Sequence, residues 1–270
     1  MKKSNIILLI LLSYGIITFI IPEVLPNSIL SPINTEAGFV LINSIIYLGL
    51  FIIAIYFRLD ESYLNTKELT FIIIYSTLTS LVRIPFAGIP NFQPCSYLII
   101  CAGIVFGPLI GFIIGGNVAL ISNIFLGHGP WTIYQIFAWG CMGASSGLIF
   151  SKYRENNFNL DKAYNLSSIN NPNLPDKSNV INKIYKVPSN ISICIFGFLW
   201  GFLFGWIMNI WYWIRYIEVH TLTSFILLNL TNIAFDFSHA LSNFLFLYFF
   251  GLPTLRILQR FKIRFKIIIR

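Results

Sequence analysis

Long apolar segments follow one another along the chain, each about as long as a membrane-spanning helix. A helix of roughly 20 apolar residues crosses about 30 Å of hydrocarbon. The lipid-facing strands of a barrel would alternate apolar and polar residues, and these segments do not. The pattern predicts an all-α, polytopic membrane helical bundle. We expect about eight spans, near Asn5–Ile21, Phe39–Phe57, Leu69–Phe86, Ser96–Phe106, Leu109–Gly127, Trp131–Phe150, Ile191–Trp213 and Leu222–Phe250.

Two of these segments have unusual lengths. Ser96–Phe106 is short, and Gly107-Pro108 breaks the chain before the next segment. Leu222–Phe250 is long enough to form two pieces, or to begin outside the hydrocarbon. The start MKKSNIILLILLSYG looks like a signal peptide, but no small-residue cleavage site follows it. We therefore expect a retained first helix.

Composition and charge agree with a membrane protein and orient it. Hydrophobic residues make up 56% of the 270 residues and charged residues only 10%, whereas a soluble domain carries about a quarter charged residues. With eight spans, only Arg83 and Arg215 of the 18 Lys and Arg lie on one side. The positive-inside rule then predicts that both termini lie in the cytoplasm. The net charge of +8 fits anionic lipid of the bilayer and not nucleic acid.

The chain changes character near Leu69. Residues 1–66 hold two nearly featureless apolar segments, and the segments in residues 67–270 are rich in small and polar residues. We expect two extra N-terminal membrane helices, followed by a six-helix functional core. Residues 151–188 form an Asn-, Ser- and Pro-rich cytoplasmic loop that we expect to be flexible.

Small residues recur at four-residue spacing, as in Ser76 and Ser80, and in Gly111, Gly115 and Ala119. Lipid provides little hydrophobic drive between helices, so small faces allow the close packing that holds them together. Most such faces are expected to pack inside the bundle. For Ser76 and Ser80 there is a second interpretation, in which they dock another membrane protein.

One polar stripe runs along the last predicted span. Its members recur at steps of three and four residues and would share one face of a helix: Asn229, Asn232, Asp236, His239 and Asn243. An acid and an imidazole inside a membrane usually face a cavity or each other. Asp236 and His239 are three residues apart and are able to pair. The residues alone leave two interpretations of the stripe: a structural hydrogen-bond network within the bundle, or side chains that face a ligand.

Further polar and aromatic residues gather near the predicted outer connections. RIPFAGIPNFQP carries Arg83, Asn91 and Phe92 on a proline-stiffened loop, which suits a lid over a pocket. Other candidates lie at or below these connections: Asn117, Asn123, Trp131, Gln135, Trp139 and Asn209. An aromatic belt at the membrane surface explains Trp131, but Gln135 and Trp139 lie deeper. An apolar pocket with a few fixed polar groups is how proteins hold small organic molecules.

No catalytic or metal-binding pattern accompanies these residues. The sequence lacks HExxH, GxSxG and P-loop motifs, and nothing supplies a nucleophile with its base. The four cysteines have no metal or redox spacing. We expect no metal, no cofactor and no enzymatic activity.

Three segments resemble the substrate-binding S component of energy-coupling-factor (ECF) vitamin transporters. They are RIPFAGIPNFQP, CAGIVFGPLIGFIIGGNVALISNIFLGHGPWTIYQIFAWGCMG and FDFSHALSNFLFLYFFGLPTLRIL. The resemblance implies a six-helix core that captures a vitamin on the outer face and hydrolyses no ATP. It also implies a membrane coupling subunit and two cytoplasmic ATPase subunits as partners, and toppling in the membrane to release the cargo.

The resemblance also implies roles for particular residues. The family docks its coupling subunit partly through small residues of the first core helix, which here are Ser76 and Ser80, where alanines are more usual. The form GPWT…Q…WG most resembles S components assigned to corrinoids or their precursors, such as cobalamin. A large, flat ligand with polar edges suits indoles and amides, and riboflavin would suit them as well.

A second class of protein stays open from the residues alone. In a self-sufficient secondary transporter, Asp236 and His239 would relay protons or coordinate an ion. Against it, the sequence shows no paired broken helices in matching halves and only one acid within the spans. An intramembrane enzyme is the weakest alternative.

Overall fold

The computed structural model describes residues 3–17, 37–61, 66–154 and 187–264, and the regular elements in these ranges are all helical. The prediction of an all-α membrane bundle is confirmed. Helices occupy every predicted span position: α1 (Lys3–Gly15), α3 (Ala37–Glu61), α4 (Thr66–Arg83), α5 (Cys95–Phe106), α6 (Pro108–Leu126), α7 (Trp131–Ile149), α11 (Asn190–Tyr216) and, for the last span, α12 (Leu222–Thr231) with α13 (Ile233–Phe246). Residues 18–21 of the first predicted span lie outside the described residues, as do residues 155–186 of the predicted flexible loop.

Length and hydropathy single out the helices that are able to cross a bilayer. Within the described residues there are four such candidates: Thr66–Phe86, Pro108–Leu126, Asn190–Tyr216 and Ile233–Lys262. Shorter apolar helices accompany them, among them Asn5–Gly15, Ile45–Phe57 and Cys95–Phe106. The chain is a multi-pass membrane protein.

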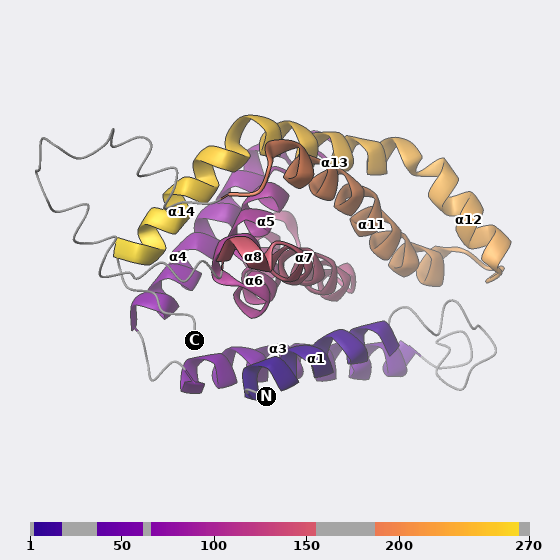
Figure 1. Cartoon of the computed structure of the whole chain (residues 1–270). Coiled ribbons are helices and arrows are strands. Elements are labelled where there is room, and N and C mark those ends of the chain that lie inside the picture. Colours follow the sequence, from indigo (N-terminus) through magenta and orange to yellow (C-terminus); the bar gives the residue numbers. More distant parts are fainter. Residues whose placement is uncertain (1–2, 18–36, 62–65, 155–186, 265–270) are drawn as a thin grey trace, which may run out of the picture.

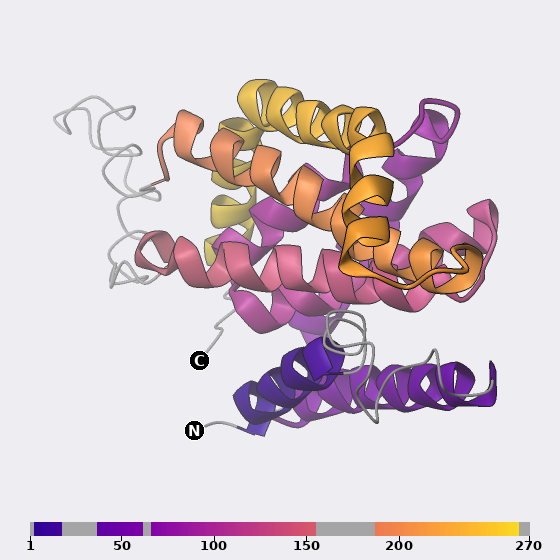
Figure 2. The same ribbon diagram turned by 90° about the vertical axis from the view of Figure 1, so that its right-hand side faces the viewer.

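The helices form three groups. In Figures 1 and 2, α1 and α3 lie side by side in a layer of their own, and α4 to α7 fill the middle. The opposite side is covered by α11, α12, α13 and a last helix, α14, which spans Leu252–Arg264. The N-terminal pair meets the middle group through apolar contacts, because Phe51 packs against Phe112 with 6.1 Å between ring centroids. The division at residue 66 into an addition and a core stays a prediction.

Glycines set the spacing within the middle group. The break between α5 and α6 falls at Gly107, whose φ of 98° is a conformation that other residues rarely adopt, and Pro108 then opens α6. A Cβ atom at Gly111 or Gly143 would collide with the backbone of the other residue. The α6 and α7 backbones therefore approach as closely as two helices can, which fixes the side chains they carry.

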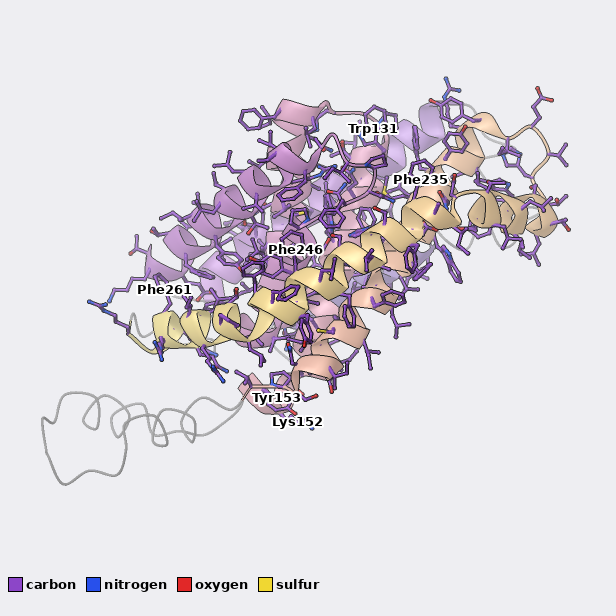
Figure 3. All side chains as sticks on the ribbon, turned by 90° about the horizontal axis from the view of Figure 1, so that it is seen from above. Trp131, Lys152, Tyr153, Phe235, Phe246 and Phe261 are labelled. Atoms are coloured by element: carbon purple, nitrogen blue, oxygen red, sulfur yellow. The ribbon has the colours of Figure 1, made fainter. Side chains whose placement is uncertain are left out.

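The last predicted span forms two helices, which is one of the alternatives that its length left open. The chain bends at Asn232, between α12 and α13, where Asn232 has ψ of 2°. The helix then continues beyond the predicted end at Phe250, through a π-helical segment (Leu247–Gly251) into α14. Figure 3 shows α13 and α14 crossing the bundle as one diagonal ribbon, with Phe246 and Phe261 along it. The Lys262 ammonium donates to the Val105 carbonyl at 3.0 Å, which joins α14 to the end of α5.

Candidate functional site

Arg83 is the centre of a buried polar network. It is the last residue of α4 and only 8% exposed. Its Nε donates to Gln93 Oε1 at 3.1 Å, and its Nη1 donates to Ser122 Oγ at 2.7 Å and Asn123 Oδ1 at 2.9 Å. The three acceptors are neutral, and Arg83 makes no ion pair with any described residue.

Asn123 of α6 extends the network to α7 through hydrogen bonds. Its amide nitrogen donates to Gln135 Oε1 at 2.7 Å and to Thr132 Oγ1 at 3.0 Å. Asn123 is 2% exposed and Gln135 is 7% exposed, so these bonds lie inside the protein. The structure therefore brings together three of the side chains predicted from the sequence, Arg83, Asn123 and Gln135.

A second arm of the network runs through an indole to α13. The Arg83 guanidinium lies 4.8 Å from the centre of the Trp139 ring, and Trp139 Nε1 donates to Ser96 Oγ at 3.2 Å. Ser96 Oγ in turn lies 2.8 Å from His239 Nε2. Trp139 is fully buried and also contacts the ring of Phe204. In this conformation the indole supports Arg83 from within the bundle. We call the whole set the Arg83 network: Arg83, Gln93, Ser96, Ser122, Asn123, Thr132, Gln135, Trp139 and His239.

Sequence reasoning missed the hydroxyl members of the network. Ser122 also donates to the Val118 carbonyl one turn back, at 2.6 Å, a bond that any helical serine is able to make. Ser96 and Thr132 have equally ordinary sequence contexts. The sequence offered one signal for two of them, their position beside a candidate site residue. Ser122 directly precedes Asn123, and Thr132 directly follows Trp131.

The connection between α4 and α5 is held down on α13. Ser238 Oγ donates to the Pro90 carbonyl at 2.8 Å, and the Gln93 backbone N–H donates to Ser242 Oγ at 3.0 Å. Phe92 packs on Phe246 with 5.7 Å between ring centroids. The candidate Phe92 thus fixes this connection in place, which agrees with the stiffness expected from its prolines. Asn91, a further candidate, has a left-handed backbone with φ of 57°.

Two other candidates join α11 to the bend before α13. The Asn209 side chain donates to Asn229 Oδ1 and accepts from Asn232 Nδ2, both at 3.0 Å. At the same end of the bundle, Trp131 lies against Trp211 with 5.4 Å between ring centroids. These contacts favour the structural interpretation for this part of the polar stripe.

Asp236 and His239 make no hydrogen bond or ion pair with each other. His239 instead contacts Ser96, and the Oδ2 atom of Asp236 is buried without a partner. The Asp236 carboxylate lies against Gly205 of α11, where an added Cβ would collide with it. Farther along the stripe, Asn243 donates to the Gly197 carbonyl at 2.9 Å. The stripe faces the interior of the bundle along α13.

The remaining candidates lie apart from the network. Asn117 is half-buried on α6 and makes no side-chain hydrogen bond with the described residues. Ser76 and Ser80 are fully buried, and Ser80 Oγ contacts the Ser76 and Val118 carbonyls at 2.8 and 3.4 Å. In this conformation Ser80 joins α4 to α6, and Ser76 Oγ is buried without a hydrogen-bond partner among the described residues.

Comparison with known protein families gives one match, to part of the chain. A family model described as the S component of ECF-type riboflavin transporters matches residues 64–169. The match supports an ECF-type S component. No curated protein and no solved structure matches the chain in the corresponding searches.

The matched region contains most of the Arg83 network. It runs from just before α4 to beyond α7, and of the network only His239 lies outside it. S components are substrate-specific, vitamin-binding subunits of transporters, and the family is not an enzyme family.

Proposed function

We propose that this S component captures its vitamin from outside a bacterial cell at the Arg83 network, and that ATP hydrolysis by partner subunits drives uptake. The partners are a membrane coupling subunit and two cytoplasmic ATPase subunits. The observation that carries this proposal is the network itself, in which polar groups of α4, α5, α6, α7 and α13 meet within an apolar bundle. We assign the chain no catalytic role.

The proposed orientation has the Arg83 network near the outer face. The network lies at the end of the bundle that carries the 84–94 and 127–130 connections. The basic helix α14 reaches Val105, at the other end of α5 from Ser96. Arg256, Arg260 and Lys262 would then lie on the cytoplasmic side, as the positive-inside rule requires.

The ligand that we propose is cobalamin or another corrinoid. Support comes from the GPWT…Q…WG form of residues 129–140, which supplies Thr132, Gln135 and Trp139 to the network. Riboflavin is the second candidate, because the matching family model is described by that vitamin. Both are large ring systems with polar edges.

The docking role of Ser76 and Ser80 also stays a proposal. Both side chains are covered within the chain, so a coupling subunit reaches them only if α4 and α6 separate there. Such a separation would be a difference between the free and the assembled S component.

Uptake into proteoliposomes tests the proposal against a stand-alone secondary transporter. The S component alone, under a proton or sodium gradient, should accumulate neither cobalamin nor riboflavin. With the coupling subunit, the ATPases and internal ATP, one of the two vitamins should accumulate. Gradient-driven uptake by the chain alone, abolished by Asp236→Asn, would favour the secondary transporter and overturn the proposal.

A further inference from the structure

Arg83 is a buried cation that no acid of the described chain neutralises. Burying a charge costs free energy unless an opposite charge or several hydrogen bonds compensate it. Here the hydrogen bonds go to neutral oxygens of Gln93, Ser122 and Asn123. Asp236 lies on α13, but Arg83 forms no ion pair with it or with any other described residue.

Two local features compensate this charge in part. Arg83 lies at the C-terminal end of α4, where the aligned peptide dipoles amount to roughly half a negative charge. The negative face of the Trp139 ring, 4.8 Å away, adds a cation–π attraction. Both act on the cation without supplying a full negative charge, so the network retains a net positive potential.

Two donor groups of the network are also left without an acceptor. A guanidinium has five N–H groups, and the bonds of Arg83 use those on Nε and Nη1. Nη2 makes no hydrogen bond with a described residue, and neither does the Gln135 amide nitrogen, since Asn123 engages only Gln135 Oε1.

The two side chains that carry these donors both bond Asn123: Arg83 donates to the Asn123 oxygen, and Gln135 accepts from the Asn123 nitrogen. Neither donor nitrogen is one of the polar side-chain atoms that are fully buried without a hydrogen-bond partner. The network thus offers a positive charge and free N–H groups on two side chains that bond the same amide, which is a pattern that suits an oxyanion.

We propose that Arg83 and Gln135 bind an oxyanion of the captured vitamin, a phosphate or a carboxylate. The proposal rests on the proposed function and narrows its ligand class. A phosphate or carboxylate would supply both the missing negative charge and acceptors for the two free donors. Cobalamin carries such a group in its phosphodiester, whereas riboflavin has none and its phosphate ester FMN does.

Ligand pairs in which only one member carries the anionic group test this directly, although cobinamide lacks the ribose and base of cobalamin as well as its phosphate. The purified full-length chain is titrated in detergent with cobalamin against cobinamide, FMN against riboflavin, and biotin against biotinamide. The first two pairs probe phosphate and the third probes carboxylate. We expect the member of one pair that carries the phosphate or carboxylate to bind about tenfold to a hundredfold more tightly than the member that lacks it, the range of one to two charge-assisted hydrogen bonds.

Variants assign the preference to Arg83. Arg83→Gln should reduce the affinity ratio within that pair to near one. Arg215→Gln, which removes the exposed arginine of α11, should leave the ratio unchanged. Arg83→Lys keeps the charge but not the fork of donors, and should retain an intermediate ratio. If Arg83→Gln does not yield folded protein, the affinity ratio in Arg83→Lys tests the proposal instead. An intermediate ratio supports the role of Arg83, and a ratio equal to that of the wild type contradicts it.

Equal affinities within every pair that binds, or a ratio that survives in Arg83→Gln, would overturn the oxyanion site and leave the proposed vitamin capture intact. Folded wild-type protein that binds no member of any pair, and none of the other vitamins, would overturn both. A preference for the anionic member that is lost in Arg83→Gln and kept in Arg215→Gln would establish the site.

Discussion

At the scale of single residues, Asn123 has the largest influence on the candidate site. Its oxygen accepts from Arg83 and its nitrogen donates to Gln135 and Thr132, so one amide orients donors from two other helices. A side chain that satisfies this many buried partners is hard to replace, because every partner left behind carries its own desolvation cost.

Asn123→Ala should weaken vitamin binding by about tenfold to a hundredfold, since Arg83 and Gln135 lose their common anchor at a cost of about 1–3 kcal/mol. The measurement is ligand affinity of the purified protein in detergent. Asn117→Ala is the matched control, because Asn117 lies on the same helix and makes no side-chain hydrogen bond with described residues. Equal affinities for the two variants would remove Asn123 from the site.

Gly205 is the other decisive single residue, because it lets the Asp236 carboxylate lie between α11 and α13. Gly205→Ala should destabilise the protein by about 1–3 kcal/mol through overpacking. Thermal unfolding in detergent measures the effect as a lower Tm. Gly49→Ala should leave Tm unchanged or slightly raised, because no atom lies within 4 Å of an added Cβ there. If both variants unfold at the same temperature, α11 and α13 do not approach as described.

At the scale of elements, the 84–94 connection and α13 behave as one unit. Gln93 contributes its side chain to Arg83 and its backbone N–H to Ser242, so the connection that borders the site is fixed to α13. Movement of α13 would therefore move an acceptor of the Arg83 network.

Ser242→Ala should loosen this connection, because it removes the acceptor of the Gln93 N–H. We expect faster hydrogen exchange in residues 87–94, measured by mass spectrometry, with exchange elsewhere unchanged. Ser145→Ala is a suitable control, since Ser145 Oγ contacts only the Met142 carbonyl of its own helix. Unchanged exchange in residues 87–94 would show that Ser242 does not hold the connection.

The sequence allowed the helices and part of the site to be predicted. The apolar segments, the break at Gly107-Pro108 and the polar candidates Arg83, Asn123, Gln135 and Trp139 are all local features of the chain. The bend at Asn232 was harder to foresee, because an apolar run with polar residues at helical spacing is compatible with one straight helix. The spacing in the sequence allowed Asp236 to pair with His239, but Ser96 of α5 bonds His239 instead, and only the packing of α5 against α13 brings these two together.

At the scale of the whole molecule, the N-terminal pair α1 and α3 lies against the middle group (Figure 1), and the hydrogen bonds of the Arg83 network involve no described residue of this pair. Its contacts with that group are aromatic and apolar, as between Phe51 and Phe112 or between Tyr47 and Phe137. We propose on this basis that the pair is an addition to a core that holds the ligand by itself.

Phe51→Ala should lower Tm, because Phe51 is fully buried against Phe112 and Gly116, while vitamin affinity stays within about twofold of wild type. Ile52→Ala, at an exposed position of the same helix, should change neither quantity. Both are read from Tm and from ligand titration of the same preparations. A Phe51→Ala protein that keeps its stability but loses affinity would place the pair in the site instead.

The most direct test of the central claim is vitamin binding by the purified chain, with no coupling subunit or ATPase present. The titration covers cobalamin, cobinamide, riboflavin, FMN, thiamine, biotin, folate and queuosine precursors. The account predicts tight one-to-one binding of a single compound or of close relatives, with cobalamin expected first. Folded protein that binds none of them would contradict the assignment of vitamin capture to this chain.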